Sequence, residues 1–415
     1  MGFKSRAAAN RSVAEAQALA RVKVSFMKKY IAFLVCLVLC IASQAQPLRD
    51  INYNYLYNPD ASVIFHLKPV RGEGSFTILY SLHVKDTTDL TNQFSIEWED
   101  RELLSDKEGN KITLQDHVTS RHAAGLQGRG TIPMAGAPKL LVARITNHEV
   151  KTAWLFYIAL EPNFPVNNFL LRNGAVVTEP YIRTTDNVVL EKDGGEWIVS
   201  YYDDDFPPAA PAFSEALSRV SRGMTIDSVY TVNAGVPVGF PKKGLYLVQR
   251  DTTALEAFAF RAEDDYPQFS QLVNLSGPLI YISTRQEAER LALAKGNKKA
   301  FDRVVLAIAS DTERARRLMR NYFRRVELAN RYFTSYKEGW KTDRGMVYII
   351  FGKPDVVFKF NDREVWNYDN DQFKISLTFT KSSSLFDPDN FVLIREKKFE
   401  NTWYEVIDLW RNARF

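Results

Sequence analysis

The fold is decided by residues 338–355, which read EGWKTDRGMVYIIFGKPD. A long helical pattern ends here, a cluster of charged and hydroxyl side chains follows, and an apolar run extends from Met346 to Phe351. We expect Gly339 to end the helix in the left-handed C′ position, with Trp340 packed back on its last turn. The apolar run is then predicted to be the first strand of a hairpin.

The polar side chains of this stretch are expected to hold the corner between helix and strand. Thr342 and Asp343 can accept hydrogen bonds from backbone amides of the turn, and Arg344 can pair with Asp343 or with a neighbouring carboxylate. Gly345 lets the chain enter the apolar run, and Pro354 supplies the next turn. The predicted role of these residues is therefore structural. They are Gly339, Trp340, Thr342, Asp343, Arg344 and Gly345.

The residues before this corner have a helical period. Thr284 with Glu287 and Ser310 with Glu313 each fit a capping box, the pattern that opens a helix. After the second box, apolar residues recur at spacings of three and four and predict a helix of about 25 residues. The members of this stripe are Ala315, Leu318, Tyr322, Val326, Ala329, Phe333 and Tyr336.

The residues after the corner read as strands joined by tight turns, at VVFKF, EVWNY and FKISLTFT. The turn at DND, residues 369–371, has the residue types of a hairpin and lacks the glycine and distal glutamate of an EF-hand loop. A closing helix is predicted from about Glu396, because apolar residues then recur with a helical period. Its apolar face is Phe399, Trp403, Val406, Ile407 and Trp410.

The first two thirds of the chain are patterned as short strands. Alternating runs such as SFTILYSLHV and TAWLFYIAL, separated by Gly, Pro, Asn and Asp, predict antiparallel β-sandwiches. Within the second of these, the proline-rich stretch DDDFPPAAPAF, residues 203–213, is predicted to be an exposed loop. The fold class is therefore mainly β with an α+β C-terminal domain: β-sandwich-like domains over residues 46–162 and 163–275, then long helices packed on an antiparallel sheet over residues 276–415.

The N-terminus reads as an export signal. Residues 27–45 combine two lysines, a short apolar run and small residues before Ala45, as in a secretory signal peptide. Because the run is too short to cross a bilayer, no transmembrane helix is expected to be retained. Residues 1–26 precede this signal and its own methionine, so they read as an artefact of start-site choice. Lipidation of Cys40 is disfavoured because Leu39, rather than a small residue, precedes it.

The net charge excludes one class of partner. The chain has 54 Lys and Arg against 49 Asp and Glu, and residues 1–45 hold seven of the bases and one of the acids, which leaves 47 against 48. The mature protein is therefore nearly neutral, and nucleic-acid binding has no global electrostatic support. Both cysteines lie in the signal run, so the exported protein has no disulfide and no cysteine-ligated metal.

The corner also carries a family resemblance. The run YFRRVELANRYFTSYKEGWKTDRGMVYIIFGKPD resembles the GWxTD domain of exported bacterial proteins, with Gly339, Trp340, Thr342 and Asp343 matching the signature letters. The stretches FPPAAPAF, KGLYLVQRDTT and AFRAEDDYP are similar to long forms of the family from Bacteroidetes, and the similarity spans about residues 165–380. The resemblance implies export and an architecture. It implies no reaction, because the family has no established activity, and it transfers no catalytic residue.

Motifs for catalysis are sparse in this sequence. It contains no G-x-S-x-G elbow, H-E-x-x-H helix, Walker loop or dinucleotide fingerprint, and no two of the five histidines have ligand spacing. We therefore expect no cofactor and no metal. The alternative is a carboxylate-dependent hydrolase acting on an envelope polymer, with acids drawn from Asp343, Asp355, Glu364 and Asp369.

The features that favour binding are basic. Residues 285–338 hold 14 bases against seven acids, and a row of arginines follows the long helix. Such a face could dock an envelope protein or an anionic envelope polymer; alternatively, the arginines pair with nearby acids and do nothing else. The sequence favours a non-catalytic binding or scaffolding protein of the periplasm or outer membrane. The candidate residues are Arg316, Arg317, Arg320, Arg324 and Arg325.

Overall fold

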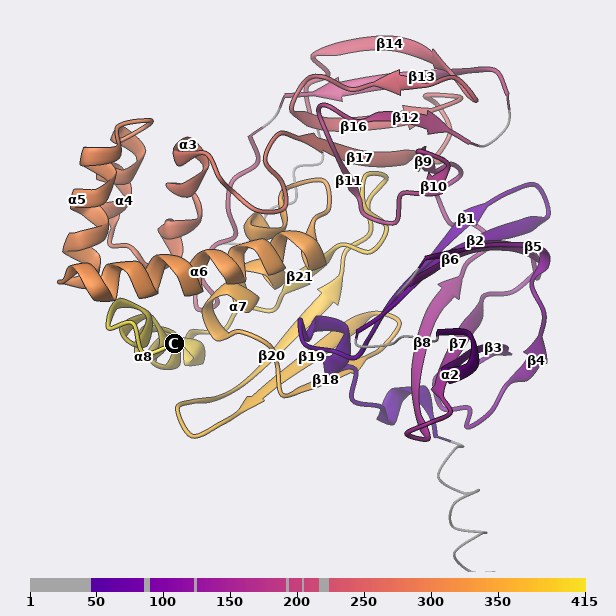
Figure 1. Ribbon diagram of the computed structural model, residues 1–415, viewed down its shortest axis with the longest axis horizontal. Helices are drawn as coiled ribbons and strands as arrows, with labels where there is room; N and C mark the ends of the chain where they lie inside the picture. Colours follow the sequence, from indigo (N-terminus) through magenta and orange to yellow (C-terminus); the bar gives the residue numbers. More distant parts are fainter. Residues whose placement is uncertain (1–45, 86–89, 123–124, 192–193, 204, 216–223) are drawn as a thin grey trace, which may run out of the picture.

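The computed structural model of the protein describes residues 46–85, 90–122, 125–191, 194–203, 205–215 and 224–415. The predicted signal peptide and the residues before it lie outside the described residues. Two β-sandwiches and an α+β part lie side by side (Figure 1). The predicted fold class is thus confirmed. No helix in the described ranges is long and apolar enough to cross a membrane.

The first sandwich consists of two four-stranded antiparallel sheets (Figure 1). Alternate residues of their strands, such as Phe76 and Ile78 of one sheet and Leu141 and Ile145 of the other, meet in one buried core, as the period of two requires. The sheets have the strand orders β1 (Val63–Arg71), β2 (Ser75–Val84), β6 (Gly125–Pro133), β5 (Gln115–His122), and β4 (Asn110–Ile112), β3 (Phe94–Arg101), β7 (Lys139–Asn147), β8 (Thr152–Leu160). A single helical turn, α2 (Leu90–Gln93), leads into β3.

The second sandwich pairs a four-stranded with a five-stranded sheet. Trp197, Phe240, Tyr246 and Phe260 fill the core between them. The sheets have the orders β10 (Ala175–Val176), β9 (Leu170–Arg172), β12 (Asn187–Leu190), β15 (Val238–Gly239), and β11 (Tyr181–Arg183), β17 (Phe258–Glu263), β16 (Gly244–Gln249), β13 (Glu196–Tyr202), β14 (Ser228–Asn233).

The α+β part packs helices against one four-stranded antiparallel sheet, in the order β18-β19-β20-β21. Its elements are α3 (Leu272–Leu275), η3 (Pro278–Ile282), α4 (Arg285–Leu293), α5 (Lys298–Ala309), α6 (Thr312–Phe333), η4 (Gly339–Lys341), α7 (Asp343–Phe351), β18 (Val356–Lys359), β19 (Arg363–Asp369), β20 (Lys374–Lys381), β21 (Phe391–Leu393), η5 (Lys397–Phe399) and α8 (Glu400–Arg411). The long predicted helix is α6, with 22 residues, and its apolar stripe is buried as far as Phe333. The predicted closing helix is α8, which buries Trp403, Val406 and Trp410.

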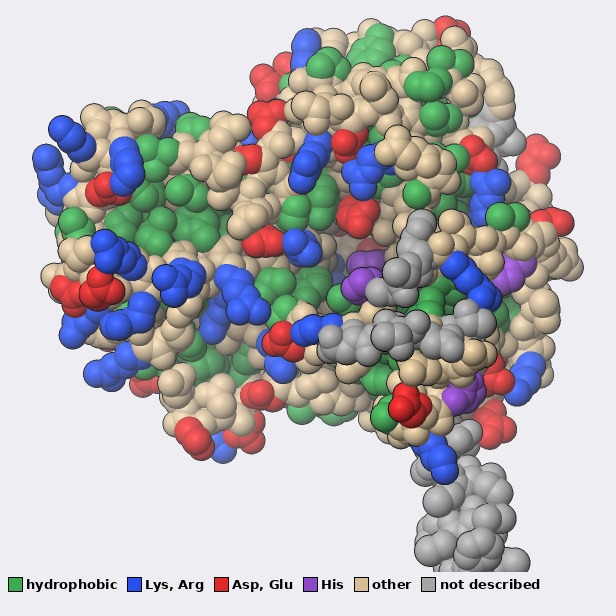
Figure 2. Space-filling model, in the orientation of Figure 1, with side chains coloured by type: hydrophobic (Ala, Val, Ile, Leu, Met, Phe, Trp, Pro, Cys, Tyr) green, Lys and Arg blue, Asp and Glu red, His purple; other side chains and the backbone are tan. Residues whose placement is uncertain are grey.

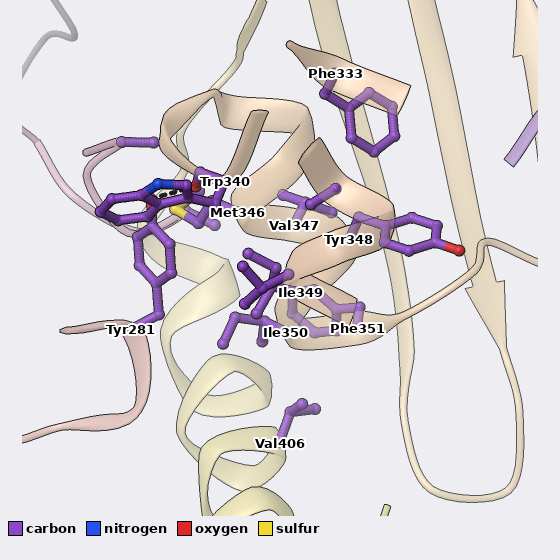
Figure 3. Close-up of a cluster of buried hydrophobic side chains, with 14 of the residues drawn as sticks. Tyr281, Phe333, Trp340, Met346, Val347, Tyr348, Ile349, Ile350, Phe351 and Val406 are labelled. Atoms are coloured by element: carbon purple, nitrogen blue, oxygen red, sulfur yellow. Dashed lines mark hydrogen bonds between the residues drawn. The ribbon is translucent and has the colours of Figure 1, made fainter. Parts of the chain in front are cut away.

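The strand predicted over residues 346–351 is wrong, because this run forms the last six of the nine residues of helix α7 (Figure 3). All six residues from Met346 to Phe351 are at most 3% exposed. A short run that is apolar on every side fits a buried helix as well as a buried strand, and period alone cannot separate them. The helix ends at Gly352, whose φ of 84° suits glycine.

The helix starts agree with the sequence in one case of two. Thr284 and Glu287 form the predicted reciprocal capping box at α4. The second box is wrong, because Ser310 ends α5 in the left-handed conformation, with φ 69°. Asp311 caps α6 instead and accepts hydrogen bonds from the amides of Glu313 and Arg314. Aspartate has a side-chain oxygen as suitable for this position as that of serine.

The prediction that the proline-rich stretch is an exposed loop is wrong. Phe206, Ala209 and Ala212 are buried, and the stretch runs from the second sandwich across the α+β part. The amide of Ala209 donates to the carbonyl oxygen of Lys341 at 3.0 Å, and the amide of Glu396 donates to that of Ala212 at 3.1 Å. The prolines thus keep the stretch extended while it covers the corner.

The residues before the first sandwich also reach the α+β part. They form two short 3-10 helices, η1 (Leu48–Asp50) and η2 (Asn54–Tyr57). The amide of Tyr53 donates to the carbonyl oxygen of Val357 in β18 at 2.8 Å, and Leu48, Tyr53 and Tyr57 belong to the same buried cluster as α6, α7 and β19. The first sandwich is therefore joined to the α+β part by a shared core.

Candidate functional site

The two glycines of the corner allow close approach of backbone segments. A Cβ atom on Gly339 would lie 2.2 Å from the carbonyl oxygen of Ala329 and 2.6 Å from Cα of Asn330, both in α6. A Cβ on Gly345 would lie 1.8 Å from the carbonyl oxygen of Gly339. The left-handed conformation expected for Gly339 is wrong, since its φ is not positive. Glycine is required there because η4 rests directly on α6.

Trp340 anchors the corner to two other elements. Its amide donates to Oδ1 of Asn330, in the last turn of α6, at 3.0 Å, and its carbonyl oxygen accepts from the hydroxyl of Tyr281 at 2.9 Å. The indole and the Tyr281 ring meet edge to face, with 6.2 Å between ring centres (Figure 3). The residue is 6% exposed. Trp340 is thus part of the core between η3 and α6.

Thr342 accepts a backbone hydrogen bond within the turn, as predicted, whereas the prediction of a turn amide for Asp343 is wrong. Thr342 caps α7: its Oγ1 accepts from the amide of Gly345 at 3.0 Å and donates to the carbonyl oxygen of Gly339 at 2.8 Å. Asp343 Oδ2 accepts from the amide of Leu393, in β21, at 2.7 Å. Its carboxylate pairs with Arg395 at 2.6 Å, so the donors to Asp343 lie on and just after a distant strand and not within the turn.

Arg344 takes the second of its two predicted partners, a neighbouring carboxylate. Its guanidinium lies 3.6 Å from Glu364 in β19 and 4.4 Å above the centre of the Phe391 ring. Glu364 is 2% exposed and also accepts from the Tyr57 hydroxyl at 2.9 Å and from Nε1 of Trp366 at 3.1 Å. Arg344 therefore joins α7 to the sheet through a buried, fully occupied carboxylate.

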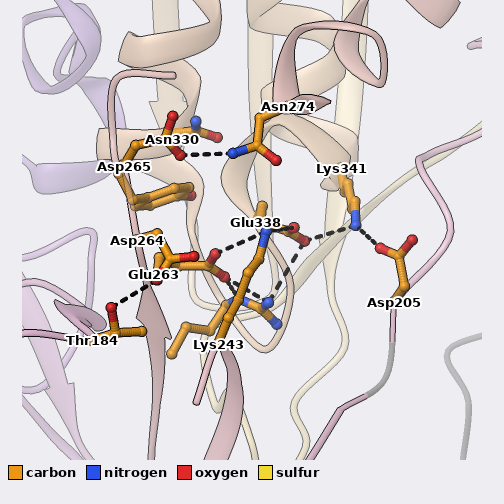
Figure 4. A network of polar contacts seen from close by, with 12 residues as sticks. Thr184, Asp205, Lys243, Glu263, Asp264, Asp265, Asn274, Asn330, Glu338 and Lys341 are labelled. Carbon is orange, nitrogen blue, oxygen red and sulfur yellow. Dashed lines mark hydrogen bonds and ion pairs between the residues drawn. The ribbon is translucent and has the colours of Figure 1, made fainter. Parts of the chain in front are cut away.

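A charged network, absent from the sequence prediction, lies beside the motif (Figure 4). Glu338 pairs with Lys341 at 3.0 Å and lies 3.9 Å from Arg261 of β17, and Arg261 pairs with Glu263 at 2.6 Å. Lys341 also pairs with Asp205 of the proline-rich stretch. The spacing of Glu338 and Lys341 was visible in the sequence, whereas nothing local pointed to Arg261 or Glu263.

The two buried carboxylates of this network have opposite pKa shifts. Burial opposes ionisation of Glu338, but the charges of Arg261, Lys341 and Lys243 outweigh it and hold the pKa of Glu338 at about 2. Burial, with the Glu338 charge beside it, raises the pKa of Glu263 above its usual range. Both residues are at most 5% exposed. These ion pairs link β17 of the second sandwich to the corner.

The comparisons with known proteins give a family for this part of the chain. Residues 244–412 match the GWxTD domain. The chain contains a GWxTD domain. The match begins at β16, so it includes two strands of the second sandwich as well as the α+β part. No curated protein and no solved structure matches the chain.

The acids proposed for hydrolysis do not gather in the GWxTD domain. Asp343 and Glu364 are buried and paired as described above. Asp355 accepts the amide of Asp369 at 2.8 Å, and Asp369 pairs with Lys374 at 2.6 Å, both on the exposed end of the sheet. None of these four acids is part of the wall of a cavity of about 530 Å³ or of one of about 310 Å³ that adjoin the domain. Within the described ranges, no three His, Cys, Asp or Glu side chains are grouped to hold a metal.

The arginines of α6 have three kinds of surroundings. Arg314, Arg316 and Arg331 pair within the helix with Asp311, Glu313 and Glu327, at 3.1, 2.7 and 2.6 Å. Arg317, Arg320 and Arg324 are exposed and form no ion pair with any described residue. Arg325 points inward. Of the five predicted binding residues, Arg316 is thus neutralised, three are bare and one is partly buried.

The cavities beside the GWxTD domain include two that arginines of α6 line. The larger, of about 530 Å³, lies between the second sandwich and α6. Two of its arginines are neutralised, because Arg172 pairs with Asp186 at 2.8 Å and Arg331 with Glu327 at 2.6 Å. The smaller, of about 310 Å³, contains Arg324 and Arg325. The smaller cavity is therefore the one in which predicted binding residues and a concave surface coincide.

Proposed function

We propose that this protein is a non-catalytic binding or scaffolding protein of the bacterial cell envelope. In this proposal the GWxTD corner holds two sandwiches and an α+β part in one arrangement, and the exposed face of α6 meets the partner. Export, and a place in the periplasm or at the outer membrane, follow from the signal peptide predicted at residues 27–45 and stay part of the proposal.

The observation that carries the proposal is the use made of the motif side chains. Thr342 caps a helix, Asp343 holds β21 and Arg395, and Arg344 holds Glu364. Each polar group therefore binds another part of the same chain; Thr342 and Asp343 are buried, and the Arg344 side chain is 16% exposed. A catalytic group needs access to a substrate, whereas a structural corner needs the opposite.

The test is recovery of a partner from its natural compartment. The exported protein, tagged at a terminus, is crosslinked gently in envelope fractions and purified under denaturing conditions. We expect one envelope component in a fixed ratio to the bait. A chain in which Arg317, Arg320 and Arg324 are changed to glutamine should lose that component, while an Arg314→Gln, Arg316→Gln chain keeps it. Repeated recovery of the bait alone would contradict the proposal.

A further inference from the structure

The smaller cavity, which we call the Arg325 pocket, is lined by four segments that are distant in sequence, the last of them the C-terminal part with Trp410 and Phe415. Its wall includes Asn58, Pro59 and Asp60 from the N-terminal part, Arg324 and Arg325 from α6, and Lys353 from the loop after α7. Asn321, one turn before Arg325, also lines it. Three cations and two amide side chains thus surround a space of about 310 Å³.

Arg325 is a cation without a carboxylate. Its Nη1 donates to the carbonyl oxygens of Ile349 and Ile350, both at 3.1 Å, at the C-terminal end of α7, where the helix dipole is negative. Its guanidinium carbon lies 4.6 Å from the centre of the Trp410 ring and 4.5 Å from that of Phe415. Burial lowers its pKa to about 10, so the group stays charged at neutral pH. Helix carbonyls and aromatic rings fix its position and leave its charge unpaired.

The other charges of the pocket leave an excess of cations. Arg324 and Lys353 are exposed and form no ion pair or hydrogen bond within the described part of the chain. Asp60 is the one acidic side chain on the wall; it is 69% exposed and already lies 3.7 Å from Lys85. The larger cavity differs, because its Arg172 and Arg331 are paired with Asp186 and Glu327. Phe415 also lines the pocket, and its backbone oxygen, which accepts from Nδ2 of Asn321, adds at most one further negative charge. Three cations thus face no more than two acidic groups, and an added anion would balance the excess.

A line of bare arginines leads into this pocket along α6. Arg317, Arg320 and Arg324 are spaced at i, i+3 and i+7, which places them on one face over about 10 Å of helix. Basic side chains gather over α6 in Figure 2. No large apolar side chain of α6 is among the exposed ones, and protein interfaces are centred on such anchors. The face therefore suits a thin, charged ligand better than a folded protein.

We propose that the Arg325 pocket binds a carboxylate or phosphate group of a linear anionic polysaccharide, and that Arg320 and Arg317 hold further anionic groups of the same strand. Guanidinium groups bind both oxyanions with paired hydrogen bonds, and the pocket volume is at the small end of the range for ligand sites, as suits one charged sugar. This inference rests on the proposed binding function and names its ligand class.

The experiment titrates the full exported chain with three probes of similar length: oligogalacturonate, inorganic polyphosphate and poly-glutamate. We expect binding of oligogalacturonate, of polyphosphate or of both, which identifies carboxylate or phosphate as the anion, and weakening with salt. The Arg324→Gln, Lys353→Gln chain should bind about tenfold more weakly. The matched control, Arg314→Gln, Arg316→Gln, loses the same charge from α6 at paired positions and should bind within about twofold of the wild type.

Three results would overturn the inference. Neither oligogalacturonate nor polyphosphate binds; or both double variants weaken binding equally, which would mean unspecific attraction; or poly-glutamate binds more tightly than either, which would point to an acidic protein. The crosslinking test separates these results from failure of the proposed function. If crosslinking recovers a partner but the titration shows no polymer binding, the proposed scaffolding function stands and the polysaccharide ligand is ruled out.

Discussion

Gly339 has no room for a side chain, and the atoms that exclude one are backbone atoms. An added Cβ would lie 2.2 Å from the carbonyl oxygen of Ala329, and α6 cannot move without disturbing its buried stripe. We expect Gly339→Ala to lower the free energy of unfolding by about 3 kcal/mol or more. The measurement is urea denaturation. Gly136→Ala is the control, because Gly136 is exposed and its Cβ would meet nothing within 4 Å; equal effects of the two changes would refute the packing argument.

We expect Asp343 to stabilise the fold, because its removal would leave the buried guanidinium of Arg395 without an ion-pair partner. Arg395 is 8% exposed at its side chain and pairs with Asp343 at 2.6 Å. Removing one partner of a buried ion pair costs about 3–5 kcal/mol, so we expect Asp343→Ala to destabilise by that amount in thermal and urea unfolding. Asp371→Ala, in the exposed hairpin turn, should change stability by less than about 0.5 kcal/mol.

The same residue separates scaffold from hydrolase. An Asp343→Asn chain that keeps the wild-type melting temperature, yet loses cleavage of an envelope polymer that the wild type cleaves, would favour the carboxylate-dependent hydrolase. The contacts of Asp343 argue against this outcome, and we expect Asp343→Asn to lower the melting temperature.

At the scale of elements, sequence patterns were sufficient wherever one face of an element is apolar. The alternation in β2 and the stripe of α6 predicted both elements, because the buried face alone sets the pattern. Helix α7 failed this test since Met346 to Phe351 are all buried. Thr342 is a good N-cap residue and could have indicated the helix. Its hydroxyl is equally suited to accept a hydrogen bond in a turn, so it did not separate the two structures.

The contact between β17 and the corner predicts a pH dependence. The pKa of Glu338 is held at about 2 by Arg261, Lys341 and Lys243 against the opposing effect of burial and of nearby Glu263. Its value in the unfolded chain is about 4.3. Because the folded pKa is the lower one, ionised Glu338 stabilises the fold above about pH 4.3, and this contribution is lost as the pH falls towards about 2.

The measurement compares wild type with Glu338→Gln at several pH values. We expect the difference in unfolding free energy between the two to be largest near neutral pH and to shrink as the pH falls from about 5 to about 2.5. Glu149→Gln, at an exposed position, serves as control and should show a small, constant difference. A difference between wild type and Glu338→Gln that does not change with pH would mean that Glu338 is not held ionised by this network.

At the scale of the molecule, the parts are joined through contacts that no local pattern reports. The proline-rich stretch was expected to be exposed, yet it places Ala209 on Lys341 and Asp205 beside the same lysine. Likewise, periodicity showed that α6 has a buried face without showing that Tyr57, more than 250 positions earlier, packs on it. Which faces meet depends on long-range packing, and a single sequence carries no direct record of it.

Tyr57 is the clearest of these joints and gives the last prediction. Its ring packs 5.1 Å from Phe333 and 4.9 Å from Trp366, centre to centre, and its hydroxyl donates to Glu364 at 2.9 Å. Because this one side chain links the N-terminal part to α6 and β19, we expect the wild type to unfold with the first sandwich and the GWxTD domain in one transition. Tyr57→Ala should split it into two.

Scanning calorimetry, with hydrogen exchange to assign each transition, measures this. Tyr57→Ala leaves a cavity in the shared core and removes one of the donors to Glu364, so β19 should lose protection at a lower temperature than β2. Tyr404→Ala is the matched control, since Tyr404 is 52% exposed on α8 and touches neither sandwich through any contact described above. If Tyr57→Ala lowers the melting temperature while the transition stays single, the parts are held together mainly by the corner network around Glu338 and Lys341, and this joint is secondary.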